Sequence, residues 1–246
     1  GTNAVGSATI LQNFEATKEG GYSKIKGYEK YSTTAVPGTG SILALKVISS
    51  GRIVVARKNS SNVTEYYYGT GTSWTSVGAR PLLGTKARSA LYNLNGDDKV
   101  LFVDGVNYPA TYNTSGNSLT AIASSTDVLG ASHVAVFKDT AFYAKGNNVF
   151  FTAPSTVDNF AAGDGAGSIS ASSDVTGLVV FRDQLIIFTS DSIKRLTGST
   201  ASDFQVSPIA SQMGCINGDT IQEVGGDIMY LAADGIRLLS ATDRIG

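Results

Sequence analysis

A pair of apolar strands joined by a short polar turn recurs five times along this chain. The second strand of each pair begins at Ile53, Val100, Ala141, Leu185 and Ile228, so the copies lie 47, 41, 44 and 43 residues apart. A repeat of about 40–45 residues is typical of four-stranded propeller blades. The spacing therefore predicts an all-β fold, a β-propeller of about five four-stranded blades.

The repeat also divides the chain. Blades are expected near residues 41–86, 87–130, 131–174, 175–217 and 218–246, preceded by a hairpin segment at residues 1–40. The last repeat reaches Gly246 after only three strands. Either a strand from residues 8–14 or 22–31 completes the fifth blade and closes the ring, or the natural chain continues past Gly246, because propellers avoid open sheet edges.

A fourth, more polar strand is expected in step with the second. Its bulky markers lie 45, 41 and 44 residues apart, at Trp74, Leu119, Phe160 and Phe204. Inner strands buried on both faces show continuous apolar runs, whereas outer strands alternate between apolar and polar residues. The decrease in apolar character along each repeat therefore predicts the order of strands from the inside to the outside of a blade.

Composition excludes several classes of protein. With 42% apolar and 16% charged residues, the chain is unlike disordered proteins. Its apolar runs have strand length and no leader-like segment precedes them, so we expect no membrane insertion. Lys and Arg number 19 against 20 Asp and Glu, which is not the excess expected of a nucleic-acid-binding protein. The densest basic patch contains Lys18, Lys24, Lys26 and Lys30, and a solvated hairpin edge explains it.

Most catalytic and metal-binding arrangements are missing. His133 and Cys215 are the single residues of their types, whereas zinc sites need three or four such ligands. His133 opens a strand and has no nucleophile elbow near it. We therefore predict no catalytic residue, no cofactor and no metal site, and a protein that is not an enzyme.

Carboxylates near strand ends are the remaining candidates for chemistry, because some five-bladed propellers are glycoside hydrolases that use two carboxylates. The candidates are Asp97, Asp98, Asp104, Asp139, Asp183, Asp227 and Asp234. Most occupy hairpin positions where Asp is favoured for turn geometry alone. The pattern favours a structural role for them.

Two groups of short segments together point to a known family. The N-terminal segments are Leu11–Glu15, Glu19–Tyr22 and Ile25–Glu29. The later ones are Phe102–Gly105, Phe181–Phe188, Gly214–Cys215, Asp219–Asp227 and Tyr230–Thr242. These segments resemble tail nozzle proteins of short-tailed bacteriophages, also called tail tubular protein B, and related packaged-DNA stabilisation proteins. These motifs are mostly strand and turn residues.

The resemblance implies a virion structural protein of the phage tail, assembled in the host cytoplasm. Such a protein forms a homohexameric ring through which DNA is retained and ejected. Its partners would be the adaptor and portal, tail fibre proteins and passing double-stranded DNA. Candidate intersubunit or DNA-channel contacts are Arg182, Lys194, Arg195 and Arg237.

Two alternatives belong to other functional classes. A lectin-like propeller would bind carbohydrate through its loops, although the loops at Asn59–Ser61, Asp104–Gly105 and Gly146–Asn148 share polarity rather than chemistry. A five-bladed glycoside hydrolase would bring two carboxylates together. The fold alone does not select among these functions.

Overall fold

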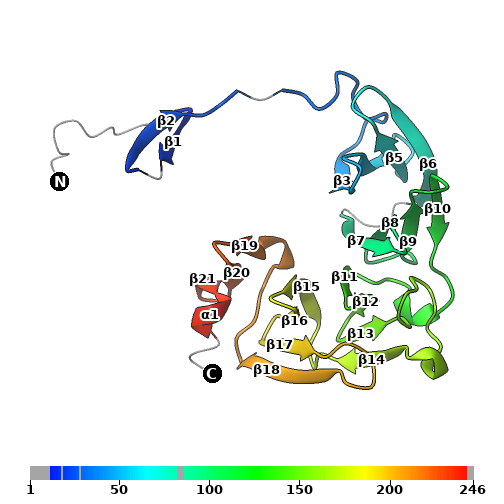
Figure 1. Ribbon diagram of the computed structural model, residues 1–246, viewed down its shortest axis with the longest axis vertical. Coiled ribbons are helices and arrows are strands. Elements are labelled where there is room, and N and C mark those ends of the chain that lie inside the picture. The colour runs from blue at the N-terminus through cyan, green and yellow to red at the C-terminus, as the bar shows by residue number, and fades with distance from the viewer. Residues whose placement is uncertain (1–11, 18, 28, 82–85, 243–246) are drawn as a thin grey trace. The chain divides into compact units, whose positions relative to one another are not determined.

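The computed structural model describes residues 12–17, 19–27, 29–81 and 86–242 (Figure 1). The chain divides into two units, residues 1–33 and 34–246. The first unit contains a two-stranded sheet of β1 (Phe14–Thr17) and β2 (Gly21–Lys24). Lys18 of the basic patch and residues 8–11 and 28 of the expected closing strands lie outside the described residues. Closure of the ring stays a prediction.

The described part of residues 34–246 contains five antiparallel sheets, each built from consecutive strands. The first sheet is β3 (Ile42–Val47), β4 (Ile53–Lys58), β5 (Val63–Gly69) and β6 (Trp74–Pro81). The second is β7 (Arg88–Leu94), β8 (Asp97–Val103), β9 (Ala110–Asn113) and β10 (Ser118–Ala121). The third is β11 (His133–Phe137), β12 (Thr140–Lys145), β13 (Asn148–Phe151) and β14 (Gly167–Ser170). The fourth is β15 (Val175–Phe181), β16 (Gln184–Thr189), β17 (Ser192–Thr197) and β18 (Gln205–Ser211), and the fifth is β19 (Gln222–Val224), β20 (Asp227–Ala232) and β21 (Gly235–Leu238).

Helical structure in the described residues is limited to short segments. There it comprises the 3₁₀ turns η1 (Thr126–Val128), η2 (Ala162–Asp164) and η3 (Gly218–Thr220) and the α-helical turn α1 (Leu239–Thr242). No helix within the described ranges is long and apolar enough to cross a bilayer. The prediction of an all-β chain with mostly four-stranded antiparallel sheets is confirmed.

The second strand of each middle sheet is buried on both faces. In β12, Ala141 and Tyr143 pack toward the second sheet, whereas Phe142 and Ala144 pack toward the fourth. Successive side chains of a strand point to opposite faces. A strand sandwiched between two sheets must therefore be apolar at every position, which explains the continuous runs in the sequence.

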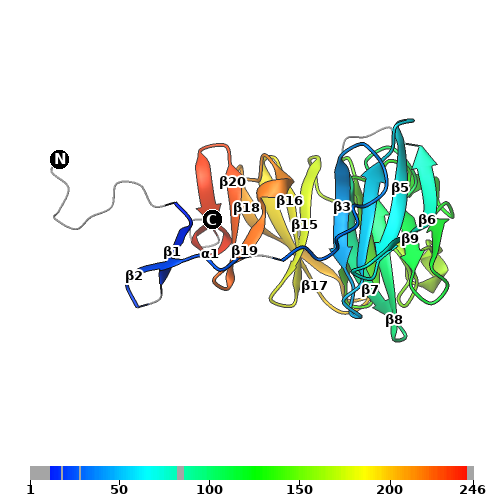
Figure 2. The same ribbon diagram turned by 90° about the horizontal axis from the view of Figure 1, so that it is seen from above.

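Consecutive sheets lie face to face, and their first strands are neighbours. β3 contacts β7, β7 contacts β11, and β11 contacts β15 (Figure 1). The strands run between two opposite faces on which the hairpin turns lie (Figure 2). We call the face that carries the turns between first and second strands the turn face, and the opposite one, where first strands begin, the entry face.

Tight turns connect the first two strands in the second to fifth sheets. Both residues between the strands have positive φ, as at Lys138 (47°), Asp139 (58°), Arg182 (46°) and Asp183 (61°). Two-residue hairpin turns of this hand match the twist of the flanking strands. The expected positive-φ hairpin turns are confirmed, with Lys and Arg as well as Gly and Asn adopting that conformation.

The prediction for the fourth strands is wrong in one repeat. Phe160 lies in a loop before η2, and the fourth strand of that sheet is β14, which begins at Gly167. Phe160 instead packs on Tyr143, with ring centroids 5.9 Å apart. The regular spacing of Phe160 therefore reflects its packing position against the third sheet and not a place in a strand.

Truncation of a side chain between two sheets should test this packing. Phe142 is fully buried and its ring lies 5.5 Å from Phe151 and 5.8 Å from Phe204. Phe142→Ala is expected to lower the free energy of unfolding by about 3–5 kcal/mol, because it leaves a cavity in the core. Urea denaturation measures this change.

The control is Ile236→Ala, since Ile236 is 73% exposed. That substitution should change the free energy of unfolding by less than about 0.5 kcal/mol. Equal losses in the two variants would contradict the stacked arrangement.

Candidate functional site

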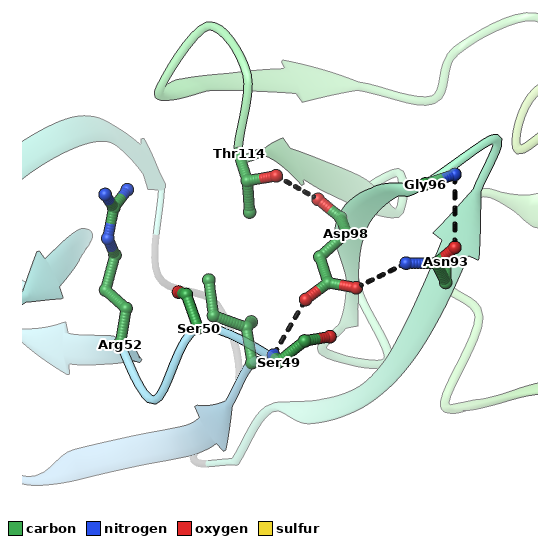
Figure 3. Close-up of a pocket in the computed structure, with 8 residues that line it drawn as sticks. Ser49, Ser50, Arg52, Asn93, Gly96, Asp98 and Thr114 are labelled. Atoms are coloured by element: carbon green, nitrogen blue, oxygen red, sulfur yellow. Dashed lines mark hydrogen bonds between the residues drawn. The ribbon is translucent and has the colours of Figure 1, made fainter.

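A polar cavity of about 310 Å³ lies on the turn face between the first and second sheets (Figure 3). The β3–β4 turn forms one wall, and the β7–β8 hairpin with the β9–β10 turn forms the other. The lining residues are Ile48, Ser49, Ser50, Arg52, Asn93, Gly96, Asp98 and Thr114. The cavity thus combines a carboxylate, a guanidinium, an amide and hydroxyl groups.

Asp98 is the fixed acceptor of this cavity. Its side chain is largely buried, and Oδ2 accepts a hydrogen bond of 2.7 Å from the Ser49 N–H while Oδ1 accepts one of 2.9 Å from Asn93 Nδ2. The hydrogen bond from Ser49 is the main cause that holds the pKa of Asp98 below its ordinary value. The carboxylate is therefore ionised and oriented at neutral pH.

Arg52 lies across the cavity from Asp98 (Figure 3). Its guanidinium carbon sits 4.6 Å from the centroid of the Tyr68 ring, a cation–π geometry. Nη1 donates to Asn117 Oδ1 at 2.8 Å and to the Tyr112 hydroxyl at 3.4 Å. Tyr112 in turn donates to Asn117 at 2.9 Å. The cation is thus held in place by neutral groups.

Turn geometry explains why these residues meet. The β7–β8 hairpin turns through Asn95 and Gly96, both at positive φ, which places Asp98 at the end of the sheet. The β3–β4 turn is longer and contains Gly51 at φ 76°. Only glycine adopts such a φ readily. The longer turn carries Ser49 and Arg52 over the neighbouring hairpin.

A second cavity, of about 170 Å³, lies on the entry face and is lined by the first strands of several sheets, with Arg88, His133 and Asp219 in its wall. Asp219 pairs with Lys86 and, at 3.1 Å, with Arg88. The hydrogen bond from Lys86 is the main cause that lowers the pKa of Asp219. These contacts join segments that are more than 130 residues apart in the chain.

His133 lies in the wall of this entry-face cavity as a packed, neutral side chain. Burial, followed by the nearby Arg88 charge, lowers its pKa to about 4. Nδ1 lies 2.9 Å from Ser132 Oγ, and no hydrogen-bond partner of Nε2 is found among the described residues. A Ser–His nucleophile pair needs a third group that orients the imidazole. The geometry does not support that chemistry.

The other candidate carboxylates form hydrogen bonds or ion pairs within the protein. Asp104 accepts from the Val106 and Asn107 N–H groups, Asp139 from Tyr92, Asp183 from Lys138, Asp227 from Ser240 and Asp234 from Arg237. Asp97 accepts from Thr114 at 3.3 Å. In the described parts of the chain, the cavities around Asp98, Asp219 and Asp227 each contain one carboxylate in their walls. None of these cavities presents the carboxylate pair of a glycoside hydrolase.

The four basic residues proposed as intersubunit or DNA contacts all bond within the protein. Arg182 Nη2 donates to the Gly226 carbonyl at 2.5 Å, and Lys194 donates to Ser172 Oγ at 2.8 Å. Arg195 donates to Ser207 Oγ at 3.2 Å, and Arg237 pairs with Asp234. Their intersubunit role stays a prediction.

Metal ligands do not gather in the described ranges, where no group of three His, Cys, Asp or Glu side chains could hold an ion. Cys215 is buried, with Sγ 3.2 Å from the Asn217 carbonyl. The absence of a metal and of a cofactor stays a prediction.

No protein-family model matches the chain, and no curated protein matches it. Solved structures do. One is the extracellular domain of a B. thetaiotaomicron protein, BT4673, assigned to the hybrid two-component systems, with 16% identity and a TM-score of 0.56 over 92% of this chain and 31% of that one. Another is the extracellular domain of BT3049, assigned likewise, with 11% identity and a TM-score of 0.53 over 82% and 28%.

At these identities the likeness concerns the fold, and the chain spans about a third of the length of the first of these structures. The prediction of a virion tail nozzle that retains and ejects DNA is wrong, as is its location in a phage tail, because these neighbours are extracellular domains of bacterial signalling proteins. The comparisons do not test the homohexamer or the partners that the resemblance implied.

Sequence reasoning found Asp98 but missed the rest of its cavity. Arg52, Asn93 and Asn117 were not among the candidates. Arg52 and Asn117 are 65 positions apart and belong to turns of different sheets. The available signal was the longer Ser49–Arg52 turn, which departs from the two-residue turns of the later repeats.

The ionised state of Asp98 should be visible in the pH dependence of stability. The folded state lowers its pKa below the ordinary 3.8, so its stabilising contribution is present above that value and is lost as pH falls through the folded-state pKa. Asp98→Asn is expected to cost about 1–3 kcal/mol at pH 7. The difference from the wild type should shrink toward about pH 3 in urea unfolding.

Asp97→Asn is the matched control, because Asp97 is the adjacent residue and, among the described residues, its carboxylate accepts a single hydrogen bond, from Thr114. It should leave the pH profile of the wild type nearly unchanged. A constant difference between wild type and Asp98→Asn from pH 7 to about pH 3 would contradict the assignment.

Proposed function

We propose that residues 34–246 form a β-propeller-like module that binds carbohydrate in the Asp98 cavity. The observation that carries this proposal is the lining of the cavity, which places an ionised acceptor at Asp98 opposite a fixed donor at Arg52. Sugar hydroxyls donate and accept hydrogen bonds, so a wall with both functions suits them.

The stacking of the sheets supports the propeller arrangement. Each buried core cluster lies between two consecutive sheets, and the first strands follow one another side by side. The pairing of Arg88 with Asp219 requires the second sheet and the segment before the fifth to approach within reach of two side chains. In a small propeller the row of sheets must curve tightly enough to bring the early and late sheets together.

The size and polarity of the cavity favour a short saccharide. Its volume, about 310 Å³, is at the lower end of the range of about 300–1,000 Å³ seen for small-molecule sites. Such sites are usually lined mainly by apolar side chains, whereas six of the eight residues that line this cavity have polar side chains. A ligand rich in hydroxyl groups fits that difference.

The extracellular setting of the structural neighbours is compatible with this proposal. Both are extracellular domains of proteins assigned to two-component systems. We infer that this chain recognises a ligand rather than transforms one, since the Asp98 cavity holds a single carboxylate.

A glycan array followed by isothermal titration calorimetry on the full chain tests the proposal. Asp98→Ala is expected to weaken the binding of a retained saccharide at least tenfold, roughly the loss of one charge-assisted hydrogen bond. Circular dichroism and urea unfolding of the variant verify that it is folded.

Asp183→Ala is the control, because Asp183 pairs with Lys138 on the turn face and does not line the cavity. It should leave the dissociation constant unchanged. Absence of saccharide binding, or equal affinities of wild type and folded Asp98→Ala, would overturn the proposal.

A further inference from the structure

Arg52 carries a positive charge that the described protein does not neutralise. Its hydrogen-bond acceptors are the Asn117 amide oxygen and the Tyr112 hydroxyl, and it lies over the Tyr68 ring. The ion pairs found within the described ranges involve Lys86, Arg88, Lys138 and Arg237, not Arg52. A half-buried guanidinium without a carboxylate partner in the protein can pair with a carboxylate of a ligand.

The donors of Arg52 are incompletely used. A guanidinium has five N–H groups on three nitrogens. Within the described residues, the protein acceptors of Arg52 all bond to Nη1, which leaves Nε and Nη2 for another acceptor. Because Arg52 lines the Asp98 cavity, a bound ligand can supply that acceptor.

The position of Arg52 is fixed before any ligand binds. The flat face of the guanidinium packs on the Tyr68 ring, and Nη1 donates to the side chain of Asn117. Asn117 is a turn residue with a φ of 47°. A side chain that is already ordered loses less entropy on binding, so the gain from a new charge-assisted contact is larger. Among the described residues that line this cavity, Arg52 is the one with a cationic side chain.

We propose that the saccharide bound in the Asp98 cavity carries an anionic group, a carboxylate as in a uronic acid, which pairs with Arg52 while sugar hydroxyls face Asp98. This inference rests on the proposed carbohydrate-binding function. The fixed negative charge of Asp98 repels the anionic group and the guanidinium attracts it, so the two walls set the orientation of the ligand. The planar guanidinium fork matches two carboxylate oxygens.

Calorimetry with three saccharides of equal length tests the inference on the full chain. The ligands are an oligogalacturonate, its neutral methyl ester and a sulfated oligosaccharide. The acid should bind about tenfold or more tightly than the ester, since a hydrogen bond to a charged group is the stronger kind. Higher salt should reduce this preference.

Substitution of Arg52 should remove the preference for the acid. In Arg52→Gln both ligands should bind less tightly, because Arg52 is also a donor to sugar hydroxyls, and the acid should lose more, so that the acid and the ester bind within about threefold of each other. Arg52→Lys keeps the charge without the fork and should retain a smaller preference. Arg80→Gln is the matched control, because Arg80 belongs to the first sheet, donates to the Pro109 carbonyl and lies outside the cavity.

The outcomes separate this inference from the proposed function. Equal binding of acid and ester to the wild type overturns the anionic ligand and leaves carbohydrate binding intact. Binding of the sulfated ligand alone overturns the carboxylate as the partner of Arg52. Persistence of the preference in folded Arg52→Gln overturns the role of that residue. Failure of all three ligands and of the glycan array overturns the proposed function itself.

Discussion

Burial of the second strands from both sides is the constraint on which the rest of the structure depends. In β8, Val100 and Phe102 pack toward the first sheet, and Leu101 and Val103 toward the third. Because neighbouring positions face different sheets, neither sheet can leave without exposing half of the strand. The sheets therefore stack in chain order, and their turns meet in register on the turn face.

The cavity follows from one departure from that register. In the later repeats, two-residue turns meet directly, as where Lys138 pairs with Asp183 or Arg182 donates to the Gly226 carbonyl. The first repeat has a five-residue connection between Val47 and Ile53. Its backbone reaches Asp98 through the Ser49 N–H, and its end presents Arg52. The longer turn of the first repeat therefore leaves the polar Asp98 cavity where the later repeats have direct contacts between turns.

Much of the fold could be predicted from the sequence, because apolar runs report two-sided burial residue by residue. The site could not, since Arg52 and Asn117 meet only after two sheets have stacked. The segments that resemble tail nozzle proteins consist of the same kinds of strand and turn residue. Among them, Phe181–Phe188 is a buried strand pair with a positive-φ turn at Arg182 and Asp183, and in Phe102–Gly105 the Asp104 carboxylate accepts two backbone hydrogen bonds of a turn. Packing and turn geometry alone account for such motifs.

The same reasoning separates structural from functional cations in this chain. Lys138 and Arg182 occupy left-handed turn positions and bond to the next hairpin, so the fold itself uses their donors. Arg88 is paired with Asp219 across the entry face. Arg52 instead lies in the wall of the Asp98 cavity, and its protein contacts are all neutral. Because Nε and Nη2 of Arg52 have no protein acceptor among the described residues, the guanidinium can bind a ligand without breaking a contact of the fold, and the chemistry of this surface is best sought there.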